Sequence, residues 1–127
     1  MSYSKIAYAL PFRARKISLV GSRKIPAVTS PKDYDFLVLC RRRKSKIKKL
    51  RRDGYVLEAG QKSCYGHLFL ERFVSLRKDD INIILTDSPK FYADFITATK
   101  VCIALNLVDR VDRVKVHKAV LYGEVST

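Results

Sequence analysis

Short apolar runs in the first two thirds of the chain predict strands, and the spacing of apolar residues in the last third predicts helices. Residues 17–20 are aliphatic and β-branched, as is typical of a short strand, and they are followed by Gly21. Residues 34–40 form a nearly continuous apolar run, which indicates a strand buried on both faces. Residues 55–58 predict another short strand. Residues 23–32 contain two prolines and predict a loop or at most one helical turn.

A hairpin and a basic helix complete the first part of the predicted fold. Residues 69–76 and 81–85 predict two strands joined across a polar tip, which is the pattern of a hairpin. Residues 44–52 predict a helix. Ile47 and Leu50 are three residues apart and share one face of it, while basic residues cover the rest.

Two helices are expected at the C-terminal end. Ser88 can cap a helix with Pro89 at its first position, and apolar residues then recur at spacings of three and four. Asp109 or Asp112 opens a second helix, which Gly123 stops. The sequence therefore predicts an α+β fold: a small mixed β-sheet with flanking helices and two C-terminal helices, in a single domain over residues 1–127.

Positive charge is concentrated in the first part of the chain. Lys and Arg total 26 against 12 Asp and Glu, a formal net charge of +14. Residues 1–52 hold 16 basic and two acidic side chains, whereas residues 53–127 hold ten of each. Such a field concentrates polyanions, so we expect nucleic acid (RNA or DNA backbone) or nucleotide phosphates as partners.

No feature of the sequence predicts a membrane or secreted protein. The longest apolar run is far shorter than the ~18 residues of a transmembrane helix, and residues 1–8 do not resemble a signal peptide. Cys40, Cys64 and Cys102 are far apart and without CxxC pairing, which indicates reduced packing residues. We therefore expect a cytoplasmic protein with no membrane partner.

The two acidic residues of the first part, Asp33 and Asp35, are two apart on a predicted strand, so their carboxylates point to the same face. Two such carboxylates repel one another unless a cation lies between them, and magnesium (or manganese) suits oxygen ligands. Gly21 follows the preceding strand and allows close approach of a phosphate, to which the Ser22 hydroxyl can donate. Next to that turn, Arg23 and Lys24 add positive charge. These parts predict a site for a nucleoside triphosphate and its metal.

The order of an apolar strand, Gly21-Ser22, a short excursion and the Asp33-Tyr34-Asp35 strand resembles the DNA polymerase β-type nucleotidyltransferase superfamily. Residues 73–85 resemble the hairpin that supplies the superfamily's third acidic strand. Residues 91–123 resemble small nucleotidyltransferase-like proteins of tailed bacteriophages. The resemblance implies that fold, magnesium-dependent nucleotidyl transfer as the activity, and, for a phage protein, location in the host cytoplasm.

The resemblance also implies a third carboxylate that faces the first two, and here Asn82 stands in its place. An amide carbonyl can ligate magnesium but cannot act as a base. The implied catalytic positions are therefore Asp33, Asp35 and Asn82, with metal ligation by the two aspartates. Phosphate and metal binding are implied more strongly than catalysis.

Nine of the twelve residues from 41 to 52 are basic: Arg41, Arg42, Arg43, Lys44, Lys46, Lys48, Lys49, Arg51 and Arg52. They suit a nucleic-acid backbone clamp, a contact with an acidic membrane or protein, or a solvated face. The clamp is favoured, because the helix directly follows the strand that carries Asp35 and is therefore expected to lie near the proposed site.

Three functions are consistent with the sequence. The first is a nucleotidyltransferase-fold protein that binds nucleotide and magnesium and transfers a nucleotidyl group to a nucleic acid or a protein hydroxyl. The second is an inactive basic accessory protein that binds nucleic acid or a host protein such as a polymerase or defence complex. The third is a minimal antitoxin that modifies a partner toxin. A simpler interpretation pairs the aspartates with nearby arginines.

Overall fold

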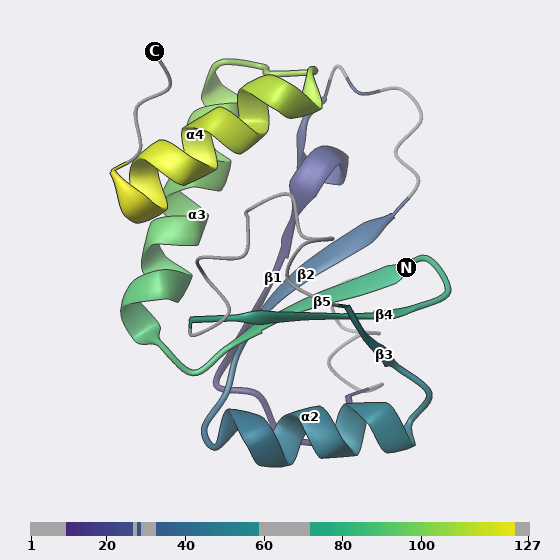
Figure 1. Cartoon of the computed structure of the whole chain (residues 1–127). Helices are drawn as coiled ribbons and strands as arrows, with labels where there is room; N and C mark the ends of the chain where they lie inside the picture. The colour runs from purple at the N-terminus through teal and green to yellow at the C-terminus, as the bar shows by residue number, and fades with distance from the viewer. Residues whose placement is uncertain (1–9, 27, 29–32, 59–71, 124–127) are drawn as a thin grey trace.

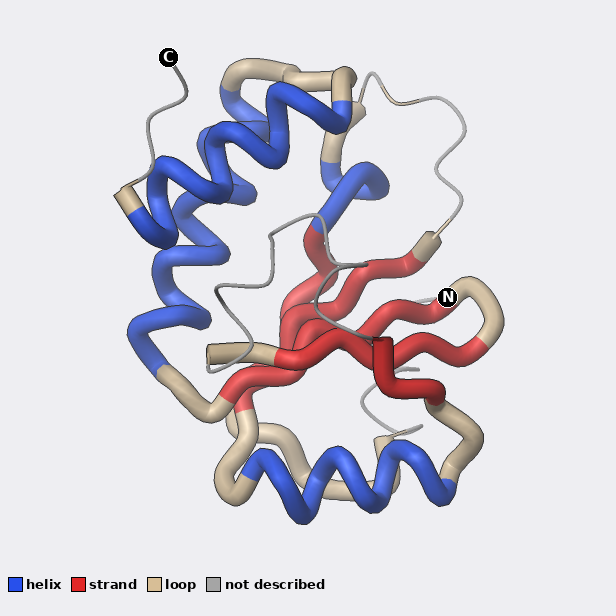
Figure 2. Tube along the Cα trace, viewed as in Figure 1, coloured by secondary structure: helices blue, strands red, loops and turns tan. Residues whose placement is uncertain are grey.

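The computed structural model contains one five-stranded sheet in the order β1-β2-β5-β4-β3 (Figure 1; Figure 2). It describes residues 10–26, 28, 33–58 and 72–123. The elements are β1 (Lys16–Val20), the 3-10 turn η1 (Gly21–Lys24), β2 (Tyr34–Leu39), α2 (Arg43–Arg52), β3 (Val56–Glu58), β4 (Val74–Lys78), β5 (Ile81–Thr86), α3 (Pro89–Ala104) and α4 (Arg110–Tyr122). The β2–β5 pair is parallel, while the other three pairs are antiparallel, so the sheet is mixed as predicted.

Helices cover both faces of the sheet (Figure 1). On one face, Phe36 and Val38 of β2 belong to the core cluster that contains Leu50 of α2. On the other face, Leu37 and Leu39 of β2 belong to the cluster that contains residues of α3 and α4. The centre of β2 is therefore buried on both sides, which explains its continuous apolar run.

Local signals determine where the C-terminal helices begin and end. The Ser88 hydroxyl accepts from the backbone N–H of Phe91 at 3.1 Å, with Pro89 at the first position of α3. Of the two predicted N-caps of α4, Asp109 and Asp112, the structure uses Asp109. Its side chain accepts from the N–H of Val111 at 3.0 Å. Gly123 ends α4 in the left-handed conformation at φ 68°.

The predicted hairpin is confirmed over its described part. Lys78 pairs with Ile81, which leaves a two-residue turn in which Asp79 has a φ of 54°. The first strand of the hairpin, β4, begins at Val74, and residues 59–71, which include the predicted start of this strand, lie outside the described residues.

The described cysteines agree with the packing role predicted for them. Cys40 and Cys102 are free and buried, while Cys64 lies outside the described residues. Burial raises the pKa of the Cys40 thiol to about 11, so this thiol stays protonated at neutral pH. No helix in the described part of the chain combines the length and hydropathy that crossing a bilayer requires.

Candidate functional site

Asp35 and Asn82 face each other across the parallel strands β2 and β5. They are direct register partners, and Asn82 Nδ2 donates to Asp35 Oδ1 at 3.2 Å. Because side chains alternate along a strand, Asp35 lies on the same face as Leu37, the face that α3 and α4 cover. The other amide atom, Asn82 Oδ1, is buried with no hydrogen-bond partner. The structure thus brings together two of the three predicted catalytic positions.

Gly21 lies directly against the Asp35 carboxylate. Its φ is 77°, and a Cβ added to it would lie 2.2 Å from Asp35 Oδ2. Any larger residue would collide with the carboxylate and would also be strained at that φ. The glycine is therefore required by Asp35, independently of the phosphate contact that the sequence predicts for it. Ser22 follows in the η1 turn.

Asp33 pairs with a residue that the sequence analysis did not identify. Arg77 of β4 places Nη1 3.1 Å from Asp33 Oδ1 and Nη2 3.5 Å from Asp33 Oδ2. The same guanidinium donates through Nε to Glu58 Oε1 of β3 at 2.9 Å. Hydrogen bonds to Glu58 and Asp33 raise the pKa of Arg77 above its ordinary value, although burial by itself would lower it. Arg77 therefore joins the start of β2 to the edge strand β3.

The basic residues of the η1 turn differ in their surroundings. Arg23 Nε donates to the backbone carbonyl of Asp33 at 3.0 Å, and its guanidinium lies 3.5 Å from the centre of the Tyr34 ring. These contacts hold η1 against the start of β2. Lys24 is exposed. Arg23 thus has a structural role in addition to any contact with a ligand.

The pKa of Asp35 is raised above the ordinary carboxyl value, mainly because burial removes the carboxylate from water. Repulsion from Asp33 raises it further. The hydrogen bond from Asn82 and the charges of Arg77 and Arg110 act in the opposite direction without cancelling the shift. The surroundings of Asp35 therefore disfavour its ionised form.

The residues present do not fit a magnesium centre in this arrangement. Both Asp33 oxygens already accept from the Arg77 guanidinium. Asp35 Oδ1 accepts from Asn82, and Oδ2 packs against Gly21. Asn82 Oδ1 is buried without a hydrogen-bond partner, and in the described ranges no three His, Cys, Asp or Glu side chains come together as a metal site. A divalent ion held by Asp33 would compete with the Arg77 guanidinium for that carboxylate.

The basic segment 41–52 does not lie beside these residues. Its helix α2 packs against the face of the sheet that carries Phe36 and Val38, opposite to Asp35 (Figure 1). The expectation that chain proximity places α2 near the aspartates is wrong, because α2 follows the far end of β2 and packs on the other face. The structure separates the predicted site residues into two surfaces.

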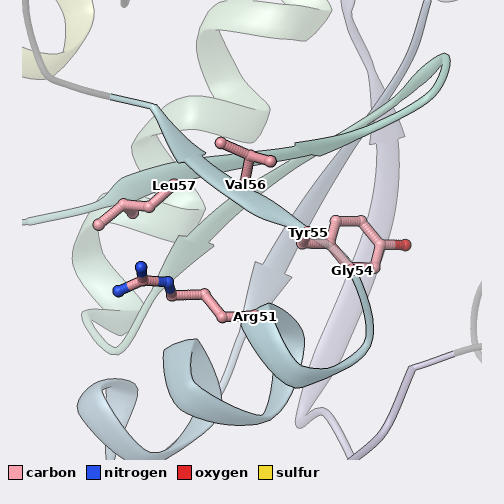
Figure 3. A pocket seen from close by; sticks show the side chains of 5 residues that line it. All are labelled: Arg51, Gly54, Tyr55, Val56 and Leu57. Atoms are coloured by element: carbon pink, nitrogen blue, oxygen red, sulfur yellow. The ribbon is translucent and has the colours of Figure 1, made fainter.

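A recess of about 420 Å³ opens at the C-terminal end of α2. Its lining residues are Arg51, Gly54, Tyr55, Val56 and Leu57 (Figure 3). Val56 is 66% exposed and Leu57 40%, so β3 presents apolar side chains to solvent beside the basic helix. The recess lies at the edge of the sheet, next to the basic surface of α2.

Arg77 and Glu58 at this site were not predicted from the sequence, and a local pattern could have indicated only Arg77. The two-residue hairpin turn places Arg77 opposite Asn82, so a registered hairpin identifies it as a neighbour of the third position. Glu58 left no such signal, because β3 and β4 pair across a long connection that includes residues 59–71.

The comparisons with known proteins bear on the fold. No protein-family model matches the chain, and no curated protein matches it. Among solved structures, the fold is similar to the conserved protein GrpB from Enterococcus faecalis, with a TM-score of 0.50 and 18% sequence identity over 95% of this chain and 90% of that one. This likeness agrees with the predicted architecture, an α+β fold with a small mixed sheet, flanking helices and two C-terminal helices.

Proposed function

We propose that this protein binds the phosphate backbone of nucleic acid through α2 and the two arginines before it, and that it does so without nucleotidyl transfer. The proposal rests on the exposure of the nine basic side chains of residues 41–52 and on their lack of acidic partners. Seven of them are exposed. Within the described part of the chain, none of the nine forms an ion pair.

The packing of α2 leaves this charge available. Leu50 is fully buried and Ile47 packs beside it, so the apolar side of the helix is used by the sheet. Of the nine basic side chains of residues 41–52, all but the half-buried Arg43 and Lys46 face solvent. The only two acids of residues 1–52 do not compensate them, because Asp33 pairs with Arg77 and Asp35 lies on the opposite face. A strip of unneutralised lysines and arginines is the usual contact surface for phosphates.

Salt dependence tests the proposal. The triple variant Lys44→Gln/Lys48→Gln/Arg51→Gln removes three charges from α2. Its control, Lys100→Gln/Lys115→Gln/Lys118→Gln, removes three from α3 and α4. If the α2 residues contact phosphates, the slope of log K against log salt should become shallower by up to about 3 in the first variant and change little in the control. Equal losses in both would show that overall charge, and not α2, binds nucleic acid.

Nucleotidyl transfer is the second candidate. It is supported by the resemblance of the sequence to the nucleotidyltransferase superfamily and by the grouping of Gly21, Asp35 and Asn82 at one end of the sheet. The ion pair between Arg77 and Asp33 argues against it, because this carboxylate already has a cationic partner. Incubation with labelled nucleoside triphosphates, magnesium or manganese, and nucleic-acid or protein acceptors decides between the two. Label transfer that Asp35→Ala abolishes would establish the enzyme and refute the non-catalytic proposal.

The resemblance of residues 91–123 to small phage proteins suggests one further partner, an acidic host protein in an infected cell. Such a protein would meet the same basic surface. The two triple variants distinguish the cases. If the α2 variant no longer binds a host protein but keeps its affinity for RNA and DNA, an acidic protein replaces nucleic acid as the proposed ligand.

A further inference from the structure

Arg77 reaches across the sheet over the position where the third carboxylate is expected. It lies on β4 and pairs in register with Asn82 of β5, which in turn pairs with Asp35 of β2. Its guanidinium contacts Asp33, just before β2, and Glu58 on β3. One cation therefore links acids from two strands that are not neighbours in the sheet.

We propose that Arg77, together with Asn82, takes the place of the divalent cation in this fold, so that the site is complete without metal. The three side chains are only partly accessible, with 35% of Arg77, 42% of Asp33 and 24% of Glu58 exposed. A guanidinium suits this position because its planar donors bind a carboxylate through two nitrogens at once, while its Nε remains free for a second acid.

The amide at position 82 is consistent with this replacement. A carboxylate there would stand directly opposite Asp35 in register and would repel it. An amide instead donates a hydrogen bond to Asp35. Three carboxylates with one divalent ion carry a net charge of −1, whereas Asp33, Asp35 and Glu58 with the Arg77 guanidinium carry −2. The arginine thus supplies part of the positive charge that a divalent ion would bring, and the amide at position 82 avoids a further negative charge.

Manganese binding to the wild-type protein tests the inference directly. The probe is Mn²⁺ alone, followed by paramagnetic broadening of the backbone NMR signals of Gly21, Asp35 and Asn82. We expect no broadening centred on these residues and the same melting temperature in Mg²⁺ and in EDTA. Broadening centred on them, lost in Asp35→Asn, would overturn the proposal. The proposed contact of α2 with nucleic acid does not enter this experiment.

A pair of variants tests the replacement in the opposite direction. Arg77→Met/Asn82→Asp removes the guanidinium and restores a third carboxylate, so it should melt several degrees lower than wild type and recover when Mn²⁺ or Mg²⁺ is added. The control Lys78→Met/Asn82→Asp keeps Arg77 and removes a lysine that instead donates to the Asp53 carbonyl. It should show no such recovery. A folded Arg77→Met/Asn82→Asp protein whose melting temperature does not rise with metal would contradict the proposal. If this variant does not fold, the Mn²⁺ measurement on the wild-type protein decides.

Discussion

Gly21 and Asp35 are in contact so close that position 21 has no room for a side chain. A Cβ there would lie 2.2 Å from Asp35 Oδ2 and 3.0 Å from its Cγ. The contact joins the turn after β1 to the first residues of β2, whose strands also pair at Val20 and Asp35. The glycine, which is also the mark of a phosphate-binding turn, therefore has a cause within the folded chain itself.

Gly21→Ala should destabilise the protein by about 2–3 kcal/mol. About 1–2 kcal/mol comes from the positive φ, and about 1 kcal/mol from the hydrogen bond with Asn82 that a displaced Asp35 loses. The free energy of unfolding in urea measures the loss. Gly123→Ala is the matched control, because Gly123 has a similar φ of 68° and nothing within 4 Å of an added Cβ. Equal losses in the two variants would mean that the contact with Asp35 contributes nothing.

Asp35→Asn should stabilise the protein at neutral pH, by about 1 kcal/mol. The folded-state pKa of Asp35 is raised, so the folded chain holds its proton more tightly than the unfolded chain does. The stability that this provides is complete below the ordinary value of 3.8 and is lost as pH rises through the folded pKa. The advantage of the variant should therefore grow from near zero at low pH to a plateau, as urea unfolding at a series of pH values can show.

Asp33→Asn is the natural comparison for that variant. It removes the same charge two residues away, but from a carboxylate that pairs with Arg77. We expect it to lower stability at neutral pH by about 0.2–1 kcal/mol, as for other partly exposed ion pairs. A gain in both variants would show that reduced repulsion between the aspartates, and not the burial of Asp35, controls their effect.

His117 should make the protein less stable as the pH falls below neutrality. It is buried, its ring packs edge-on against Phe95 with centroids 4.6 Å apart, and Nδ1 donates to the Arg113 carbonyl at 2.9 Å. Burial lowers its pKa below 6.5, so the unfolded chain takes up a proton first. Stability should fall as pH drops below 6.5, by up to about 1.4 kcal/mol per pH unit, until the folded pKa is reached.

His117→Gln checks this assignment, because glutamine can still donate to the Arg113 carbonyl but does not titrate. The variant should be less stable than wild type at neutral pH, and its stability should be flat over the interval in which wild type declines. Chemical unfolding across that interval compares the two slopes. An unchanged slope in His117→Gln would assign the acid sensitivity to another group.

Arg42→Gly should stabilise α2 by about 1 kcal/mol. Arg42 is the N-cap of the helix, has φ 53° and ψ 62°, and makes no side-chain capping hydrogen bond. The left-handed region disfavours an L side chain but not glycine. Arg41→Gly removes an equal charge from a residue without positive φ, and it should not raise the melting temperature. A similar gain from both would identify relief of charge repulsion as the cause.

Local patterns along the chain were sufficient for most of the elements. The aliphatic run at β1, the run buried on both faces at β2 and the helical spacing of α3 are visible without the fold, since burial of a strand or a helix face requires these periods. The caps Ser88 and Gly123 also act through their own neighbours. The shared face of Asp33 and Asp35 follows from the two-residue period of a strand. The position of Asn82 opposite Asp35 was implied only by the resemblance, because it depends on the pairing of β2 with β5.

Only the tertiary structure decided what those side chains meet. A sequence does not state which face of the sheet a helix covers, so the position of α2 opposite Asp35 could not be read from its place in the chain. The Arg77 bridge could not be predicted from the sequence either. Asp33, Glu58 and Arg77 meet through strands that are far apart in sequence and are paired by burial of their common core. The sequence by itself determined the acids and their spacing, whereas long-range packing decided that the cation beside them is an arginine.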